Sequence, residues 1–435
     1  MKYENFCKIT DGVYKITDSS VPFPDNVPAV QAGTTAKISD SSDMSFRVRV
    51  DNVTPQDFEA YKSYLANSGY TLVAQNKIGD NIFASFENEE NSVHTYFCPV
   101  FSHIRVMAEK NRHYSLCEDG EQTAEPAVFA STISDRTFYT RLADNTFVII
   151  DGGWRLQDMR DFKRDVLFGG FVKELQKICG MEKITVTAWF ITHPHLDHAT
   201  FLEGVHLYGY DKYFDVKRII RNSPVCDDIP ISKWTPSASL TEGAKNNYPE
   251  LELNDFGYAL VLEKAYKRWS NTQIIKARTG MKFTFSGMDF EIYLTPDDTT
   301  PATTINGLSL LIMQSYNGRK ILWTGDMSTF AGDIALKMYG DCLRCDAVQI
   351  AHHGWGGAGS FEFYRTCNAP VQLWNNSEYG FKYADSNQGY GKTEVSTLCY
   401  DMPCCKRHVF CGGIRMEKLP LTGEMYCDFE ERFKL

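Results

Sequence analysis

The sequence lacks any apolar run of the ~18–20 residues that a membrane-spanning helix requires. Its first residues, Met-Lys-Tyr-Glu-Asn-Phe, also lack the apolar stretch of a secretory signal peptide. Short-period repeats and low-complexity tracts are missing from the 435 residues as well. These absences predict a cytoplasmic protein that is neither exported nor partnered with a membrane.

Basic charge is in deficit, because 45 Lys and Arg residues stand against 55 Asp and Glu residues and the net charge is −10 at pH 7. Such a surface repels the phosphate backbone of nucleic acids over most of its area. We therefore expect no extended nucleic-acid surface, and any contact with nucleic acid would have to be local and metal-assisted.

A paired cysteine framework is also missing. The 13 cysteines are an odd number scattered from Cys7 to Cys427, unlike those of a small disulfide-rich secreted domain. Cys342 and Cys345 do form a CxxC pair, but a zinc ribbon would need a second pair, and a redox pair would need a strand-to-helix setting. The sequence therefore favours a reducing compartment and ordinary buried thiols.

The chain does have enough apolar material for a large core, since 43% of its residues are hydrophobic, and its length allows two or three domains. We predict a small α+β domain over residues 1–120. Its helix is predicted over residues 57–68, where Phe58, Tyr61 and Leu65 share one face, and strands are expected before and after it.

Residues 127–435 are predicted to form a second, larger domain, because short apolar strands alternate there with helical segments. Helices are expected over residues 158–179 and 255–270. The stretch 224–249 is predicted to be a long loop, and loops of that length in a compact domain are usually functional.

One segment contains most of the candidate metal ligands. It reads His193-Pro-His195-Leu-Asp197-His198 and follows an apolar strand predicted over residues 186–190. Three imidazoles and a carboxylate within six residues, on a turn after a buried strand, can converge on one or two metal ions. The chain has 10 histidines in all and places three of them here, which argues against a purely structural role. Imidazole and carboxylate ligands suit Zn, and also Fe or Mn.

This His-x-His-x-Asp-His motif resembles that of the metallo-β-lactamase-fold superfamily, and the match is complete. Three further segments resemble other motifs of that family, and they occur in the family's order. Residues 147–153, which contain Asp151, precede the histidine motif, and residues 322–326, which end in Asp326, and residues 346–354 follow it. The resemblance covers roughly residues 127–415. It implies an α/β (α+β) fold, a four-layer αβ/βα sandwich preceded by the small N-terminal α+β domain.

The pairing of Thr-Gly-Asp326 with His352-His353-Gly is similar to one branch of that superfamily, the hydrolase domain of competence-type ComEC/Rec2 proteins and the bacterial phosphorylcholine esterases. Those relatives act on phosphodiesters. The sequence lacks the membrane channel segments of the former and the choline-binding repeats of the latter. The resemblance therefore implies phosphodiester chemistry without identifying the substrate.

The resemblance also implies a site for two divalent metals, with Zn favoured over Fe or Mn, and it implies that Asp151 orients the ligands from behind. The first ion would take His193, His195 and one histidine of the 352–353 pair. The second would take Asp197, His198 and a bridging Asp326. Because adjacent strand residues point to opposite faces, we predict that His352 completes the first site and that His353 faces the cleft as a candidate proton donor.

Two departures from the family pattern accompany this assignment. His206 lies on a predicted helix that leads away from the motif, and we expect it to be structural. After the strand predicted over residues 371–374, where the family commonly has its last histidine ligand, the chain has Asn375 and Asn376. The second site is therefore predicted to lack one protein ligand and to bind its metal more weakly.

The function expected from these residues is hydrolysis by a metal-bound hydroxide that Asp197 ligates and orients, and the expected substrate is a small molecule or a phosphodiester, with the phosphodiester favoured. Hydrolysis of an ester, amide or thioester on the same centre is the alternative enzyme, because a fold does not fix a substrate. A catalytically degenerate metal-binding protein is the rival from another class.

Overall fold

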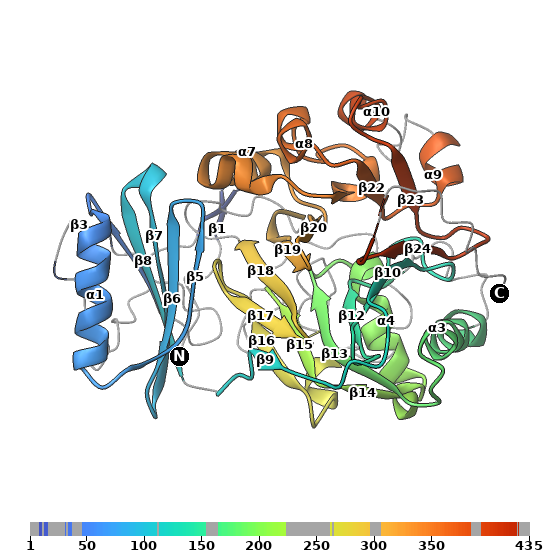
Figure 1. Cartoon of the computed structure of the whole chain (residues 1–435), viewed down its shortest axis with the longest axis horizontal. Helices are drawn as coiled ribbons and strands as arrows, with labels where there is room; N and C mark the ends of the chain where they lie inside the picture. Colours follow the sequence, from blue (N-terminus) through green and yellow to red (C-terminus); the bar gives the residue numbers. More distant parts are fainter. Residues whose placement is uncertain are drawn as a thin grey trace.

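The computed structural model is shown in Figure 1. It describes residues 8–10, 13–15, 31, 34–36, 46–110, 113–153, 164–222, 262, 265–295, 306–383, 393–423 and 425. The predicted loop over residues 224–249, the start of the helix predicted from residue 158 and most of the one predicted over 255–270 lie outside these ranges. No described helix is both long enough and apolar enough to cross a membrane.

A six-stranded antiparallel sheet with one helix is formed by the N-terminal part of the chain. The strand order is β3-β4-β8-β7-β6-β5, and the bounds are β3 Thr34–Ala36, β4 Phe46–Asp51, β5 Thr71–Ile78, β6 Asn81–Glu87, β7 Asn91–Cys98 and β8 His103–Lys110. A separate hairpin pairs β1 (Lys8–Thr10) with β2 (Val13–Lys15). This sheet occupies the left of Figure 1, with the helix α1 on its outer face.

Helix α1 (Pro55–Asn67) forms as the sequence predicts, because its start is capped and its apolar residues share a face. Thr54 and Asp57 make a reciprocal capping box, which satisfies backbone N–H groups of the first turn. Phe58, Tyr61 and Leu65 are buried against the sheet.

The first of two larger sheets has the order β16-β15-β13-β12-β11-β10-β24, and β14 pairs with β13. Its strands are β10 Ala127–Ala130, β11 Phe138–Arg141, β12 Phe147–Ile150, β13 Ile184–Ile191, β14 Phe214–Val216, β15 Arg218–Arg221, β16 Gln273–Lys276 and β24 Glu417–Pro420. Helices α3 (Arg164–Cys179) and α4 (Leu196–Leu207) pack on its outer face through an aromatic-rich core that includes Phe171, Trp189 and Phe201.

The second larger sheet has the order β23-β22-β21-β20-β19-β18-β17-β9. Its strands are β9 Cys117–Glu118, β17 Lys282–Phe285, β18 Met288–Leu294, β19 Leu311–Tyr316, β20 Arg319–Trp323, β21 Ala347–Ile350, β22 Val371–Trp374 and β23 Arg407–Phe410. The later helices are α7 (Thr329–Tyr339), α8 (Phe361–Cys367), α9 (Glu378–Tyr383) and α10 (Glu394–Tyr400). All four contribute residues to a core shared with this sheet, and α7, α8 and α10 lie along the top of Figure 1.

The two larger sheets pack face to face on a shared apolar core. Rings from opposite sheets meet there, with centroids 5.6 Å apart for Phe190 and Phe290 and 5.4 Å apart for Phe138 and Trp323. Helix, sheet, sheet and helix thus form the four-layer αβ/βα sandwich that the sequence predicts. Burial of large aromatic side chains is the main contribution to stability in such a core.

The N-terminal sheet joins this sandwich through its face opposite α1. Ile78, Phe83 and Tyr96 share a core with Tyr293 and Met338 of the larger unit. Polar contacts accompany the apolar ones. Nδ2 of Asn81 donates to the carbonyl oxygen of Met338 at 2.7 Å.

The ten cysteines of the described chain are free thiols, of which four are buried, five are half-buried and one is exposed. Cys342 lies in a 3₁₀ turn, Gly340–Leu343, and Cys345 follows that turn. This is not the strand-to-helix setting of a redox pair.

Candidate metal centre

The candidate ligands follow the carboxyl ends of strands from both larger sheets. Strands β12 and β13 are parallel neighbours in one sheet, and β20, β21 and β22 are parallel neighbours in the other. Parallel strands end at the same edge of a sheet, so the polar segments that follow them meet there. The seam between the two sheets therefore brings together residues separated by up to about 220 positions: Asp151, His193, His195, Asp197, His198, Asp326, His353 and Asn375.

The turn after β13 is shaped by the start of helix α4. His195 is the N-cap residue of this helix, and Asp197 and His198 lie in its first turn. A carboxylate there is favoured by the positive end of the helix dipole. Gly153 lies directly beneath this turn, and a Cβ atom on it would be 2.5 Å from the backbone of Asp197. Only glycine fits at that position without displacing the start of α4.

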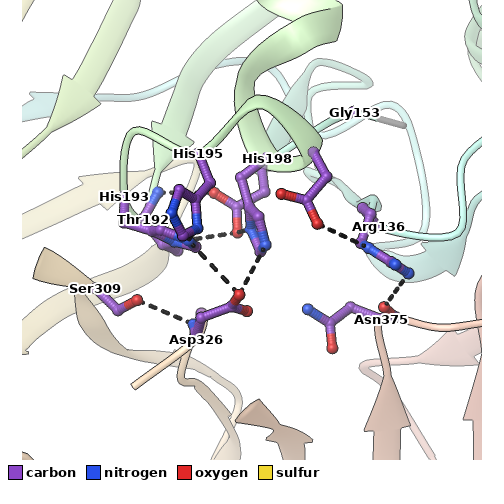
Figure 2. A network of polar contacts seen from close by, with 12 residues as sticks. Arg136, Gly153, Thr192, His193, His195, His198, Ser309, Asp326 and Asn375 are labelled. Carbon is purple, nitrogen blue, oxygen red and sulfur yellow. Dashed lines mark hydrogen bonds and ion pairs between the residues drawn. The ribbon is translucent and has the colours of Figure 1, made fainter. Parts of the chain in front are cut away.

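Two groups of side chains have donor atoms close enough to share a metal ion. The first comprises His193, His195 and Asp326, and the second comprises Asp197, His198 and His353. Within each group the ligand atoms lie within 4.8 Å of one another. Figure 2 shows the three imidazoles of the turn directed toward Asp326.

Asp326 lies between the two groups. Its Oδ2 atom is 3.6 Å from Nε2 of His193, 3.3 Å from Nε2 of His198 and 3.4 Å from Nε2 of His353. Its backbone N–H donates to Oγ of Ser309. Gly325 has a φ of +53°, and a Cβ atom on it would be 2.6 Å from Oγ1 of Thr192. Glycine is therefore required for this turn to approach the one after β13.

Hydrogen bonds behind the imidazoles fix which nitrogen faces the centre. Nδ1 of His198 donates to Oδ2 of Asp151 at 2.8 Å, and Nδ1 of His353 donates to the carbonyl oxygen of Asn375 at 2.8 Å. Each Nε2 atom then carries the lone pair that a metal requires. Such buried partners behind the ligands are typical of metal-binding histidines.

His193 is oriented by a similar relay. Its Nδ1 atom lies 3.1 Å from Oγ1 of Thr192, whose hydroxyl donates to Oδ2 of Asp151 at 2.8 Å. The other oxygen of Asp151 accepts the backbone N–H of Thr192 at 2.7 Å. Asp151 thus lies behind the ligands, in the position that the family resemblance implies.

The electrostatics of the cluster also suit cations. Burial, together with the nearby His198, holds the pKa of His193 well below its ordinary value, which keeps that imidazole neutral. Burial alone would raise the pKa of Asp326, but His198, His353 and His193 hold it well below its ordinary value. The carboxylate is therefore ionised. Against the effect of burial, the carboxylates of Asp326, Asp151 and Asp197 hold the pKa of His198 well above its ordinary value, so a metal would displace a proton from that ring. The donor set combines imidazoles with ionised carboxylates and has no thiolates, and it fits a pair of Zn, Fe or Mn ions.

The histidine pair after β21 differs from the prediction in its backbone. Strand β21 ends at Ile350, and His352 and His353 both have left-handed backbone angles, with φ of 48° and 59°. The alternation of a strand therefore does not apply to them. His353 belongs to the second ligand group, and neither group includes His352.

His352 remains close to the centre. It is half-buried, and its Nδ1 atom donates to the carbonyl oxygen of Gly356, which leaves Nε2 with a lone pair. Its assignment as the ligand that completes the first site stays a prediction. His353 was predicted to be a proton donor, but its Nδ1–H is already bonded and its Nε2 lies 3.2 Å from Oδ2 of Asp197, which favours a ligand role.

His206 and the asparagines after β22 take other roles. His206 lies in the last turn of α4, where Nε2 contacts the carbonyl oxygen of Arg268 at 3.2 Å and the ring packs edge-on against Trp269. Asn376 donates from Nδ2 to the carbonyl oxygen of His353 at 3.2 Å. The asparagines thus hold His353 in place, whereas the sequence indicated only a missing ligand.

Sequence reasoning missed Arg136. It lies between β10 and β11, its side chain has no exposed area, and its Nε atom is 3.4 Å from Oδ2 of Asp197. Figure 2 shows it between Gly153 and Asn375. Together with His198 and His353, and against the effect of burial, Arg136 holds the pKa of Asp197 well below its ordinary value. No local motif surrounds this arginine, so the sequence offers no signal for it.

No protein-family model matches the chain, and no curated protein matches it. Solved structures do. The diiron β-hydroxylase CmlA from Streptomyces venezuelae is 10% identical with a TM-score of 0.40, over 69% of this chain and 55% of that one. A diphosphatase from the PhnP family is 12% identical with a TM-score of 0.36, over 69% of this chain and all of that one. The chain thus spans about half the length of the hydroxylase.

Proposed function

We propose that this protein is a metal-dependent hydrolase with a binuclear centre and that its substrate is a phosphodiester. The observation that carries the proposal is the position of Asp326. One of its two carboxylate oxygens, Oδ2, lies within 3.6 Å of imidazole nitrogens from both ligand groups. A carboxylate shared in this way is what two neighbouring cations require. Two such ions would supply Lewis-acid activation of the phosphoryl group and an acidified water.

The protein's own residues would hold and orient this chemistry. His193, His195 and Asp326 would hold one ion, with His352 as a further ligand, and Asp197, His198 and His353 would hold the other. Asp197 is fixed by the start of α4 and by Arg136, so one of its oxygens can accept a hydrogen bond from a water in the cleft. Preference for a phosphodiester rests on the similarity of the segments ending in Asp326 and His353 to phosphodiester-cleaving relatives.

The test is hydrolysis of bis-p-nitrophenyl phosphate by the whole chain loaded with zinc, manganese or iron, with and without chelator. We expect chelator-sensitive turnover that His193→Ala abolishes and His206→Ala leaves intact. Elemental analysis of the same samples should find close to two metals per chain. A protein without metal after expression with all three ions would contradict the proposal.

The two alternatives give different outcomes in the same assay. Turnover of p-nitrophenyl acetate or nitrocefin without phosphodiester turnover would identify the alternative hydrolase of an ester, amide or thioester bond. Two bound metals without turnover of any of these substrates would indicate a catalytically degenerate metal-binding protein.

A further inference from the structure

Arg136 brings a buried positive charge to the edge of the ligand groups. Its Nη1 atom donates to the carbonyl oxygen of Asn375 at 2.9 Å and contacts Asp135, through the carbonyl at 3.1 Å and the carboxylate at 3.0 Å. Its Nε atom lies 3.4 Å from Oδ2 of Asp197. The guanidinium also lies over the ring of Trp355, with Cζ 5.2 Å from the ring centroid. These contacts hold the guanidinium in one orientation.

Polar atoms beside these contacts are buried and lack a partner among the described residues. They are Nη2 of Arg136 and both side-chain atoms, Nδ2 and Oδ1, of Asn375. Asn375 is completely buried, and its backbone carbonyl accepts from both Arg136 and His353. Figure 2 shows its amide directed into the space between Asp326 and Arg136. Buried donors without partners cost free energy, so their concentration here indicates a ligand that satisfies them.

We propose that Nη2 of Arg136 and the side-chain amide of Asn375 bind a negatively charged oxygen of the substrate's phosphoryl group. This inference rests on the function proposed above and names the residues that would select its substrate. A guanidinium is permanently charged and its planar donors match phosphate oxygens. Because its contacts already fix it, little side-chain freedom would be lost when the anion binds.

The asparagine fits the same role. An imidazole at position 375 could serve as a metal ligand, whereas a carboxamide presents N–H donors that suit an anion. The backbone carbonyl of Asn375 links the proposed anion-binding residues to the second ligand group, because the same oxygen accepts from Arg136 and from His353. Asn375, which stands where a histidine ligand is expected, thus supplies a hydrogen-bond donor for the substrate.

The test measures binding of phenylphosphonate, an unreactive tetrahedral anion, to the metal-loaded chain by calorimetry, with metal content determined on the same samples. Arg136→Lys keeps the charge and loses Nη2. Asn375→Leu removes only the amide and leaves the backbone carbonyl in place. We expect each variant to bind phenylphosphonate about tenfold more weakly or worse, with metal content unchanged.

Arg218→Lys is the matched control. Arg218 is also buried and ion-paired, with Nη1 2.6 Å from Glu118, but it lies at the opposite, amino-terminal end of β15. This variant should bind phenylphosphonate as the wild type does. Phenylacetate, a planar anion of similar size, should bind the wild type more weakly than phenylphosphonate.

Several results would overturn the inference: unchanged affinity in both variants, no phenylphosphonate binding by the loaded wild type, or tighter binding of phenylacetate. If Arg136→Lys also loses its metal, Arg136 serves only to hold Asp197, and Asn375→Leu then decides the matter alone. Failure of the proposed function would give a different experimental result. It would appear as absent phosphodiester hydrolysis while phosphonate binding still depends on Arg136 and Asn375.

Discussion

Asp151 orients the metal-binding histidines although it belongs to neither ligand group. Its two oxygens accept from the backbone and hydroxyl of Thr192 and from Nδ1 of His198. In Asp151→Asn, one of these oxygens becomes an NH₂ group that faces a donor. We expect metal affinity to fall ~10- to 100-fold, as is typical when a partner behind a ligand is lost, with the fold retained. Metal titration with a competing chelator measures the change.

Asp144→Asn provides the control for that substitution. Asp144 also accepts from a backbone N–H and a threonine hydroxyl, both of Thr146, but it lies in the turn between β11 and β12. Its substitution should leave metal affinity unchanged. Equal losses in the two variants would show that the effect of Asp151→Asn is on stability and not on the centre.

The histidines near the centre should separate by metal content. We expect His353→Ala to lower the metal bound per chain by close to one, because His353 contributes Nε2 to the second ligand group. His206→Ala should change nothing, since its ring packs against Trp269. His352→Ala should weaken the first site if its Nε2 is a ligand. Full metal occupancy in His353→Ala would contradict the assignment of the second group.

Among the elements, helix α4 is the one whose placement decides the geometry of the centre. A Cβ atom on Gly153 would be 2.5 Å from the backbone of Asp197, and backbone cannot yield as a flexible side chain can. We therefore expect Gly153→Ala to lower both the thermal midpoint and metal affinity. Gly169→Ala is the control, because in helix α3 its Cβ would have ordinary contacts of 3.5 Å or more. It should be neutral or stabilising.

The same elements show how far the sequence could predict the site. The segment from His193 to His198 is contiguous and follows an apolar strand, so its role in metal binding can be predicted from the local sequence pattern alone. Arg136 and Asn375 reach the centre only because strands distant in sequence end at one seam, and neither has a local motif. The roles of His352 and His353 could not be predicted from strand alternation for another reason. Their left-handed backbone breaks the strand alternation on which the prediction depended.

Across the whole molecule, a buried carboxylate links the N-terminal sheet to the sandwich. Glu109 on β8 lies 3.3 Å from Nη2 of Arg278, which follows β16, and 3.2 Å from Nε2 of His94. Burial opposes its ionisation, but Arg278, His94 and Lys276 hold the pKa of Glu109 well below its ordinary value of 4.5. Because the unfolded chain binds the proton more readily, the stability from this ionised group is complete above that value and is lost as the pH falls below it.

We therefore expect the wild type to lose more stability than Glu109→Gln between about pH 5 and pH 3, although the variant is less stable at pH 7. Urea unfolding at several pH values, in the presence of chelator, gives the comparison. Glu59→Gln, a change on the exposed face of α1, should follow the wild type. Parallel pH profiles for wild type and Glu109→Gln would show that Glu109 does not contribute in this way.

The position of the ligands at the seam between the two sheets has a mechanical consequence. The first ligand group takes His193 from the β13 side and Asp326 from the β20 side, so an ion held by both would act as a removable cross-link between the halves of the sandwich. Unfolding would then release it, and the free energy of unfolding should rise by ~1.4 kcal/mol for each tenfold increase in free metal above the dissociation constant of one site. Thermal midpoints that do not move with metal or chelator would contradict this. A midpoint that rises as expected would report metal affinity without the use of any substrate.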